Sequence, residues 1–276
     1  MTTVEQSTEL TSEQVTHFET FGYVVLRGLF SPEEMTEISQ AYDDVMEEDR
    51  GGKPFTGPKR QQVLGICSMR PRLMQLIDDD RIYNPIKQLL GPSFIYLVSD
   101  ATLFVGSKSW HPDGVPRSQA EFDYMRIKVA FYPDPLRSLT GCLRVIPGSH
   151  KRPFHDSIMP QMTDGKANPF GVSMEGLPAV PLETDPGDVI FFDQNTWHAS
   201  VGGGTGRRQM SLNYFAEPTT DDHSEYLKWI WEEGVVNHMK VSSGTQRDQI
   251  HGDAFLNSER PRIREMIERK MELGLR

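Results

Sequence analysis

PGDVIFFDQNTWHASVGGGTGRRQMSLNYF, residues 186–215, contains two apolar runs that are separated by a turn, a histidine and a glycine-rich segment. Similar short runs recur from Phe94 onward, among them FIYLV, ATLFVG, YMRIKVAFY and CLRVIPG, with Gly, Pro or Asn between them. Short strands at this spacing are typical of an antiparallel sandwich or barrel rather than of alternating strand–helix units. Residues 94–216 are therefore predicted to form a jelly roll or a related barrel.

The segments on either side of this predicted barrel, about 11–90 and 222–276, show helical patterns. Ser31 and Glu34 have capping-box spacing with Pro32 at the first helical position, which predicts a helix over about 32–48. A second helix is predicted over about 71–90, before Gly91-Pro92. Helices at both ends can pack on an outer face of the sheet. The sequence thus predicts an α+β protein with one domain over residues 1–276.

Composition narrows the possible partners and ligands. The 276 residues carry 29 Lys and Arg against 39 Asp and Glu, a formal net charge of −10, so nucleic acid and anionic membrane surfaces are unfavourable partners. No apolar run is long enough to span a bilayer, and MTTVEQSTEL lacks the pattern of a secretory signal, so we expect a cytoplasmic protein. Two cysteines are too few for a thiolate site. A metal would have to be held by His and carboxylate groups.

His111 and Asp113, in SKSWHPDGVP, are candidates for two such ligands. On an extended segment, residues i and i+2 point to the same face, and Gly114 lets the chain turn away directly afterwards. A solvated turn remains the alternative for this pair alone. His198, between the two apolar runs of 186–215, is the candidate third ligand.

The last predicted strand carries two adjacent arginines on opposite faces. Arg208 shares its face with Met210, Leu212 and Tyr214, and this more apolar face is expected to point inward. A buried arginine needs an anion, either a ligand or a protein carboxylate. A bulge between Gly206 and Gln209 would exchange which of Arg207 and Arg208 points inward.

Two histidines and one carboxylate are the ligand set of non-haem Fe(II) oxygenases. In addition, the chain resembles the phytanoyl-CoA dioxygenase family of Fe(II)- and 2-oxoglutarate-dependent oxygenases over most of its length. The resemblance is carried, in order, by FETFGYVVLRGLFSPEEM, WHPD, GCLRVIPGSHK and WHAS…GRRQMSLNYF. It implies a double-stranded β-helix core of the jelly-roll or cupin-like type, flanked by N- and C-terminal helices.

The resemblance also implies the roles of individual residues. His111, Asp113 and His198 correspond to the iron ligands, and Arg208 to the arginine that binds the distal carboxylate of 2-oxoglutarate. Ser200 corresponds to a hydroxyl donor at the same carboxylate. The implied reaction consumes O2 and 2-oxoglutarate, releases succinate and CO2, and oxidises a small organic metabolite. Hydroxylation, desaturation, epoxidation and ring closure all remain open.

Other features bear on the type of reaction and on the substrate. Halogenases of related type have a small residue in place of the carboxylate ligand, so Asp113 favours oxidation over halogenation. Arg126 and Lys128 alternate with apolar residues and are candidate substrate contacts, with solvent exposure as the alternative. The segment 151–180 is expected to cover the pocket. Two competing classes, a non-catalytic metal-binding jelly roll and a cupin-like enzyme without 2-oxoglutarate, do not need an anion clamp such as Arg208 with Ser200.

Overall fold

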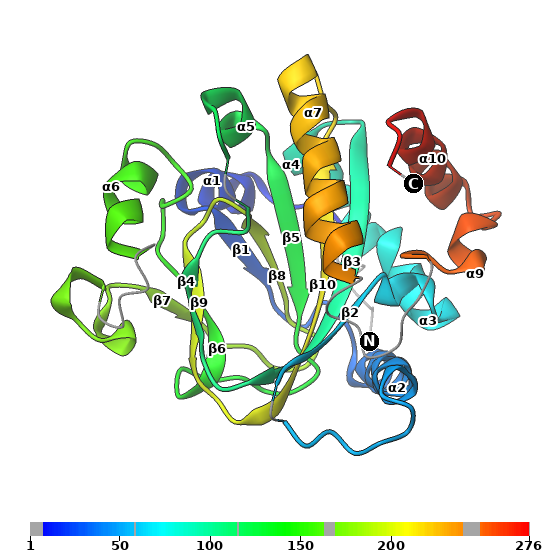
Figure 1. Cartoon of the computed structure of the whole chain (residues 1–276), viewed down its shortest axis with the longest axis horizontal. Coiled ribbons are helices and arrows are strands. Elements are labelled where there is room, and N and C mark those ends of the chain that lie inside the picture. Colours follow the sequence, from blue (N-terminus) through cyan, green and yellow to red (C-terminus); the bar gives the residue numbers. More distant parts are fainter. Residues whose placement is uncertain (1–7, 58, 115, 163–168, 240–248, 276) are drawn as a thin grey trace, which may run out of the picture.

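The computed structural model describes residues 8–57, 59–114, 116–162, 169–239 and 249–275. Two antiparallel sheets face each other and form the barrel (Figure 1). The larger sheet contains, in spatial order, β1 (Tyr23–Leu26), β8 (Val189–Asp193), β5 (Arg126–Phe131), β10 (Thr205–Ala216), β3 (Phe94–Val105) and β2 (Gln61–Leu64). The smaller sheet contains β4 (Lys108–His111), β9 (His198–Gly202), β6 (Thr140–Val145) and β7 (Val180–Leu182).

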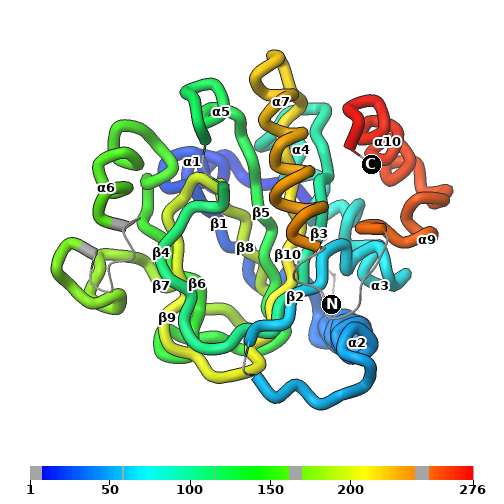
Figure 2. The backbone as a smooth tube through the Cα atoms, viewed as in Figure 1, coloured from blue at the N-terminus to red at the C-terminus, as the bar shows by residue number. Residues whose placement is uncertain are grey.

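Helices from both ends of the chain contribute to the layer that packs on the larger sheet. The elements concerned are α2 (Pro32–Asp49), α3 (Pro71–Met74), α4 (Asp80–Leu90), α9 (Asp253–Leu256) and α10 (Pro261–Glu272). Figure 2 shows the N-terminal and C-terminal segments meeting on this side of the molecule. Buried residues of these helices form one apolar cluster with β5 and β10, so both flanks stabilise the same sheet.

Further helices lie at the start of the chain and around the open end of the barrel. They are α1 (Ser12–Phe21), α5 (Gln119–Asp123), α6 (Phe154–Met162), α7 (Asp221–Trp229) and the π-helix that continues α7 (Ile230–Asn237). No helix in the described ranges is long and apolar enough to cross a membrane.

Local sequence explains where the elements begin and end. The Ser31 capping box is present, and α2 starts at Pro32 as expected. The prediction of one continuous helix over 71–90 is wrong, because α3 runs into a 3₁₀ turn and α4 then starts afresh. The side chain of Asp79 accepts a hydrogen bond from the backbone N–H of Arg81, which caps the new helix. The short strand β2 was not predicted.

The two faces of β10 decide which side chains reach the barrel interior. Met210, Leu212 and Tyr214 belong to the apolar cluster shared with the helices, so they face away from the cavity between the sheets. Gln209 and Asn213, on the alternate face, line that cavity. The expectation that the more apolar face points inward is wrong, since the helical layer buries the outer face even more completely.

Candidate functional site

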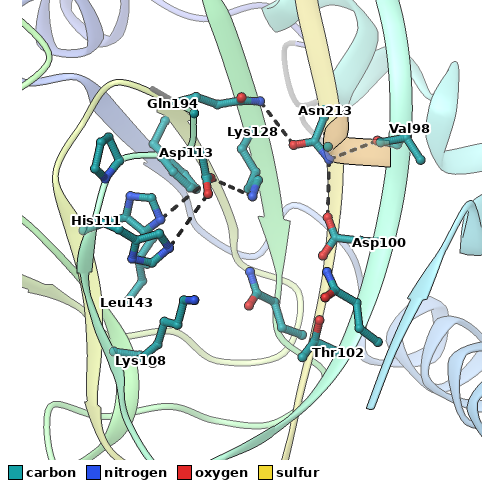
Figure 3. Close-up of a pocket in the computed structure, with 18 of the residues that line it drawn as sticks. Val98, Asp100, Thr102, Lys108, His111, Asp113, Lys128, Leu143, Gln194 and Asn213 are labelled. Carbon is teal, nitrogen blue, oxygen red and sulfur yellow. Dashed lines mark hydrogen bonds and ion pairs between the residues drawn. The ribbon is translucent and has the colours of Figure 1, made fainter. Parts of the chain in front are cut away.

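Three potential metal ligands converge at the edge of the smaller sheet, where β4 and β9 pair (Figure 3). His111 ends β4 directly opposite His198, which begins β9. Asp113 follows two residues after His111. Its Oδ1 lies 3.9 Å from Nε2 of His111, and its Oδ2 lies 3.7 Å from Nε2 of His198. One ligand atom from each of the three residues lies within 4.8 Å of the others, close enough to share one ion.

Backbone carbonyls orient both imidazoles. Nδ1 of His111 lies 2.7 Å from the carbonyl oxygen of Ser109, and Nδ1 of His198 lies 2.8 Å from that of Thr196. Each Nδ1 can donate its hydrogen there, which leaves the Nε2 lone pair directed at the shared space. Burial, followed by the neighbouring His198, lowers the pKa of His111 to about 3, and burial also lowers the pKa of His198. Neutral imidazoles beside a carboxylate fit a divalent iron.

Asp113 is held by its own loop and by a lysine on the opposite sheet. Its backbone N–H donates to the carbonyl of Gln194 at 2.8 Å, and Lys128 on β5 places Nζ 2.6 Å from Oδ2. Burial opposes ionisation of Asp113, but Lys128 and the two histidines outweigh it, so the pKa of this carboxyl lies well below its usual value. Gly114 has a φ of +93°, and a Cβ atom there would collide with Arg126. The tight turn after Asp113 therefore needs glycine.

The site opens into a cavity of about 390 Å³ between the two sheets. This volume lies within the usual range of small-molecule sites. The walls are formed by inward-facing residues of β2, β3, β5, β9 and β10, together with the π-helix. Several of the lining polar residues were not predicted, including Gln62, Asp100, Thr102, Lys108, Gln209 and Asn213. Their alternation with apolar residues along the strands would have identified them if the polar face had been taken as the inner one.

Arg207, and not Arg208, points into this cavity. Arg207 is only 7% exposed, and its guanidinium donates to Oγ of Ser200 at 2.8 Å. Its other hydrogen bonds go to the carbonyls of Gly106 and Gly202, at 3.2 and 3.4 Å. A Cβ atom at Gly141 or Gly203 would collide with the guanidinium, so the surrounding backbone is shaped around this side chain. Burial lowers the pKa of Arg207.

Arg208 leaves the barrel on the outer face of β10 and forms ion pairs there. Its guanidinium lies 2.6 Å from Oδ1 of Asp134 and 2.8 Å from Oδ2 of Asp43 on α2. The assignment of Arg208 as an inward-facing anion clamp is therefore wrong. The strand alternation was correct, but the inner face was chosen incorrectly; a register shift between Thr205 and Arg207 precedes both arginines and does not separate them.

The two candidate substrate residues on β5 have different surroundings. Lys128 lines the cavity, although its ammonium contacts Asp113. Arg126 is almost completely buried, and it donates to the hydroxyl of Tyr226 at 2.9 Å, to the backbone carbonyl of Asp113 at 3.1 Å and to the side-chain oxygen of Asn195. Arg126 does not line the cavity and is a support of the Asp113 loop, so its assignment as a substrate contact is wrong.

The segment expected to cover the pocket lies elsewhere. Among the described residues of 151–180, none lines the cavity, and residues 163–168 lie outside the described part of the chain. Ile230, Gly234, Val235 and His238, in the π-helix and directly after it, line the cavity instead. Helices of this type are often found at functional sites.

The chain is similar in sequence and in fold to known oxygenases. The family model for phytanoyl-CoA dioxygenase (PhyH) matches residues 18–210. The ectoine dioxygenase of Bordetella parapertussis is 24% identical over 221 residues, which cover 69% of this chain and 70% of the relative. The ectoine dioxygenase of Nocardia farcinica is 24% identical over 228 residues, with coverages of 70% and 73%.

Solved structures agree with the predicted fold. HygX from Streptomyces hygroscopicus, with nickel and 2-oxoglutarate bound, superposes with a TM-score of 0.60 at 18% identity, covering 77% of this chain and 90% of HygX. SnoK, an alpha-ketoglutarate-dependent carbocyclase from nogalamycin biosynthesis, gives a TM-score of 0.57 at 19% identity, with coverages of 75% and 84%. These likenesses confirm the predicted α+β jelly-roll fold. Because the family model spans more than half of the chain, the chain belongs to the phytanoyl-CoA dioxygenase family and is an iron- and 2-oxoglutarate-dependent dioxygenase, as the sequence predicted.

Proposed function

We propose that this dioxygenase oxidises a small organic metabolite in the cavity between the two sheets, with His111, Asp113 and His198 as the iron ligands. The observation that carries this proposal is the presence, in one cavity, of the His111, Asp113 and His198 set and of a buried arginine that has no carboxylate partner among the described residues. Iron together with 2-oxoglutarate and O2 supplies the oxidising chemistry and yields succinate and CO2.

Arg207 and Ser200 are proposed to bind the distal carboxylate of 2-oxoglutarate. The hydrogen-bond partners of Arg207 among the described residues are a hydroxyl and two carbonyls, and none of them neutralises its charge. A buried cation without an anion is energetically unfavourable, and a planar guanidinium can hold a carboxylate through two parallel hydrogen bonds. Ser200 is two residues beyond His198 on β9, so it places this anion site beside the metal ligands.

Lys128 is proposed to position Asp113 rather than to contact the substrate. Its ammonium lies 2.6 Å from Oδ2, so it can hold one carboxylate oxygen while the other stays available to the ion. A carboxylate that binds through one oxygen leaves more coordination positions free for small molecules. Burial acts against the charge of Lys128, but Asp113 reverses this effect and raises the pKa of the lysine, which keeps it protonated.

Asp113 also favours oxygen insertion, or an oxidation that continues from it, over halogenation. A halide ligand needs the coordination position that this carboxylate occupies. The names of two similar proteins, ectoine dioxygenase and a carbocyclase of nogalamycin biosynthesis, indicate small-molecule substrates for those proteins. A cavity of about 390 Å³ supports the same size class here.

We further propose that residues 1–276 act as one catalytic domain. Gln62 and Leu64 come from the N-terminal flank, and Ile230, Val235 and His238 come from the C-terminal flank, yet all five line the cavity of the barrel. A barrel without either flank would lose part of the pocket wall and the layer that covers β5 and β10.

The direct test is to incubate the purified enzyme with Fe(II), 2-oxoglutarate and O2 and to quantify succinate. Slow succinate formation is expected without substrate, and a metabolite library should contain compounds that increase it and gain one oxygen or lose two hydrogens. A His198→Ala variant is the control without an intact ligand set. Equal succinate from the wild type and this variant would contradict the proposed site.

A further inference from the structure

A cation lies at one edge of each sheet, beside the cavity. β2 is the last strand of the larger sheet and β4 is the first strand of the smaller one. Arg60 directly precedes β2, Lys108 begins β4, and both side chains line the cavity. These two cations have no role in the iron and 2-oxoglutarate sites assigned above.

Lys108 points into the space between the sheets, below His111 in the view of Figure 3. In the described part of the chain, the side chains of Lys108 and Arg60 form no hydrogen bond and no ion pair. Burial lowers the pKa of Lys108, and the nearby cations Arg60 and Lys128 lower it further, whereas Asp113 acts in the opposite direction. Lys108 and Arg60 are therefore close enough to repel each other, and neither has a carboxylate partner among the described residues.

The carboxylates of the cavity do not supply that anion. Asp113 is engaged by Lys128 and faces the two histidines. Asp100, on β3 of the larger sheet, accepts hydrogen bonds at Oδ2 from Ser211 at 2.5 Å and from Asn213 at 3.3 Å. Asp100 raises the pKa of Lys128, but it is not among the groups that shift the pKa of Lys108.

We propose that Lys108 and Arg60 form a subsite for an anionic oxygen group of the substrate, a carboxylate or a phosphate. The inference rests on the proposed function, since it assigns the substrate class of the same cavity. The chain as a whole has a formal charge of −10 and repels anions, so two cations that line the cavity without an anion create a local exception. A carboxylate or phosphate that bridges them would remove the repulsion between the two cations.

Part of the remaining cavity wall is apolar, which bears on the rest of the substrate. Leu97, Phe215, Ile230 and Val235 line the cavity beside the polar groups, and the last two belong to the π-helix. Apolar walls with a few polar anchors are typical of small-molecule pockets. The substrate class is thus an organic anion with an apolar body, held with its charge at the β2–β4 edge.

The experiment uses the Fe(II)-loaded full chain with 2-oxoglutarate and a library of matched compounds. Each carboxylate is paired with its amide or methyl ester, and each phosphate monoester is paired with its parent alcohol. We expect the anionic members to increase succinate formation and the neutral members to do so much less. Carboxylate hits without phosphate hits, or the reverse, identify which anion the subsite takes.

Variants then assign the effect to the subsite. For the best anionic compound, Lys108→Met should raise KM about tenfold or more, as expected for a lost hydrogen bond to a charged group, and Arg60→Met should raise it less because Arg60 is exposed. The KM for 2-oxoglutarate should change by less than about twofold in both variants. Lys59→Met, an exposed neighbour that does not line the cavity, is the matched control and should leave both constants unchanged.

Three results would overturn the inference. The first is succinate formation that only neutral or cationic compounds increase, and the second is an enzyme that forms succinate but that no anionic compound stimulates. The third is a Lys108→Met variant whose main defect is in 2-oxoglutarate binding. The last would place Lys108 in the cosubstrate site. A wild-type enzyme that forms no succinate under any condition would instead contradict the proposed function itself, so the two failures are distinguishable.

Discussion

Replacement of Arg207 by Ala tests the cosubstrate site, because it removes the one buried guanidinium that lines the cavity among the residues the structure describes. In the complex we propose, this change leaves the distal carboxylate of 2-oxoglutarate in the cavity without its main partner. Truncation of one member of a buried charge pair costs about 2–5 kcal/mol, which corresponds to roughly 30-fold to several-thousand-fold in affinity. Arg207→Ala should therefore raise the KM for 2-oxoglutarate by at least about 30-fold.

The assay is succinate formation at varied 2-oxoglutarate, with bound iron measured in parallel. Iron content should be unchanged, because Arg207 contacts none of the three proposed ligands. Since the backbone of Gly141 and Gly203 packs against the guanidinium, Arg207→Ala should also lower stability. Arg207→Lys keeps the charge and much of the volume, yet it loses the paired hydrogen bonds, so a smaller rise of about tenfold is expected.

The matched control is Arg208→Ala, on the adjacent residue and the opposite face of β10. Its ion pairs with Asp134 and Asp43 are partly exposed, and such pairs contribute about 1 kcal/mol or less to stability. The KM for 2-oxoglutarate should stay within about twofold of the wild-type value. A large rise in Arg208→Ala with little change in Arg207→Ala would refute the assignment made from the structure.

Three further predictions concern the metal ligands and the stability of the fold. Asp113→Ala should abolish coupled oxidation and weaken Fe(II) binding, measured by activity and by metal titration, and full activity would show that another carboxylate serves. Lys128→Met should destabilise the metal-free protein by about 2 kcal/mol, because Asp113 loses its counterion. Co(II) should replace the missing counterion and raise the melting temperature of this variant more than that of the wild type, and an equal rise would argue against the counterion role of Lys128. Arg81 lowers the pKa of Glu34 to about 2, so the contribution of Glu34 to stability is present above about pH 4.5 and is lost as the pH falls toward 2. Urea unfolding should show Glu34→Gln to be less stable than the wild type by about 1 kcal/mol at pH 7, with the difference disappearing near pH 2; a constant difference would contradict this.

The barrel could be predicted from the sequence because its strands are short, apolar and separated by turn residues. The three residues that converge as candidate metal ligands could also be named from the sequence, since His111 and Asp113 share a face on an extended segment and His198 begins a strand in a recognisable block. The choice between Arg207 and Arg208 could not be made in this way. Period-2 alternation separates the two faces of β10, but it does not tell which face meets the cavity when the other is buried under helices.

Other differences between the sequence predictions and the structure also arise from features that local patterns do not encode. β2 is only four residues long and begins with two glutamines, so its sequence gives little strand signal, although it supplies Gln62 to the cavity. The separation of α3 from α4 depends on the cap made by Asp79, within a pattern that is otherwise continuously helical. Ile230 and Val235 line the cavity because the C-terminal flank packs against the barrel, and local periodicity does not encode this packing.

The most direct test of the proposed site is an anaerobic crystal structure of the enzyme with Fe(II) and 2-oxoglutarate. The account predicts one iron bound by Nε2 of His111, a carboxylate oxygen of Asp113 and Nε2 of His198, at distances of about 2.0–2.3 Å. It also predicts that the distal carboxylate of 2-oxoglutarate is paired with Arg207 and Ser200. Iron bound by other residues, or a 2-oxoglutarate carboxylate paired with Arg208 or Lys108, would contradict it.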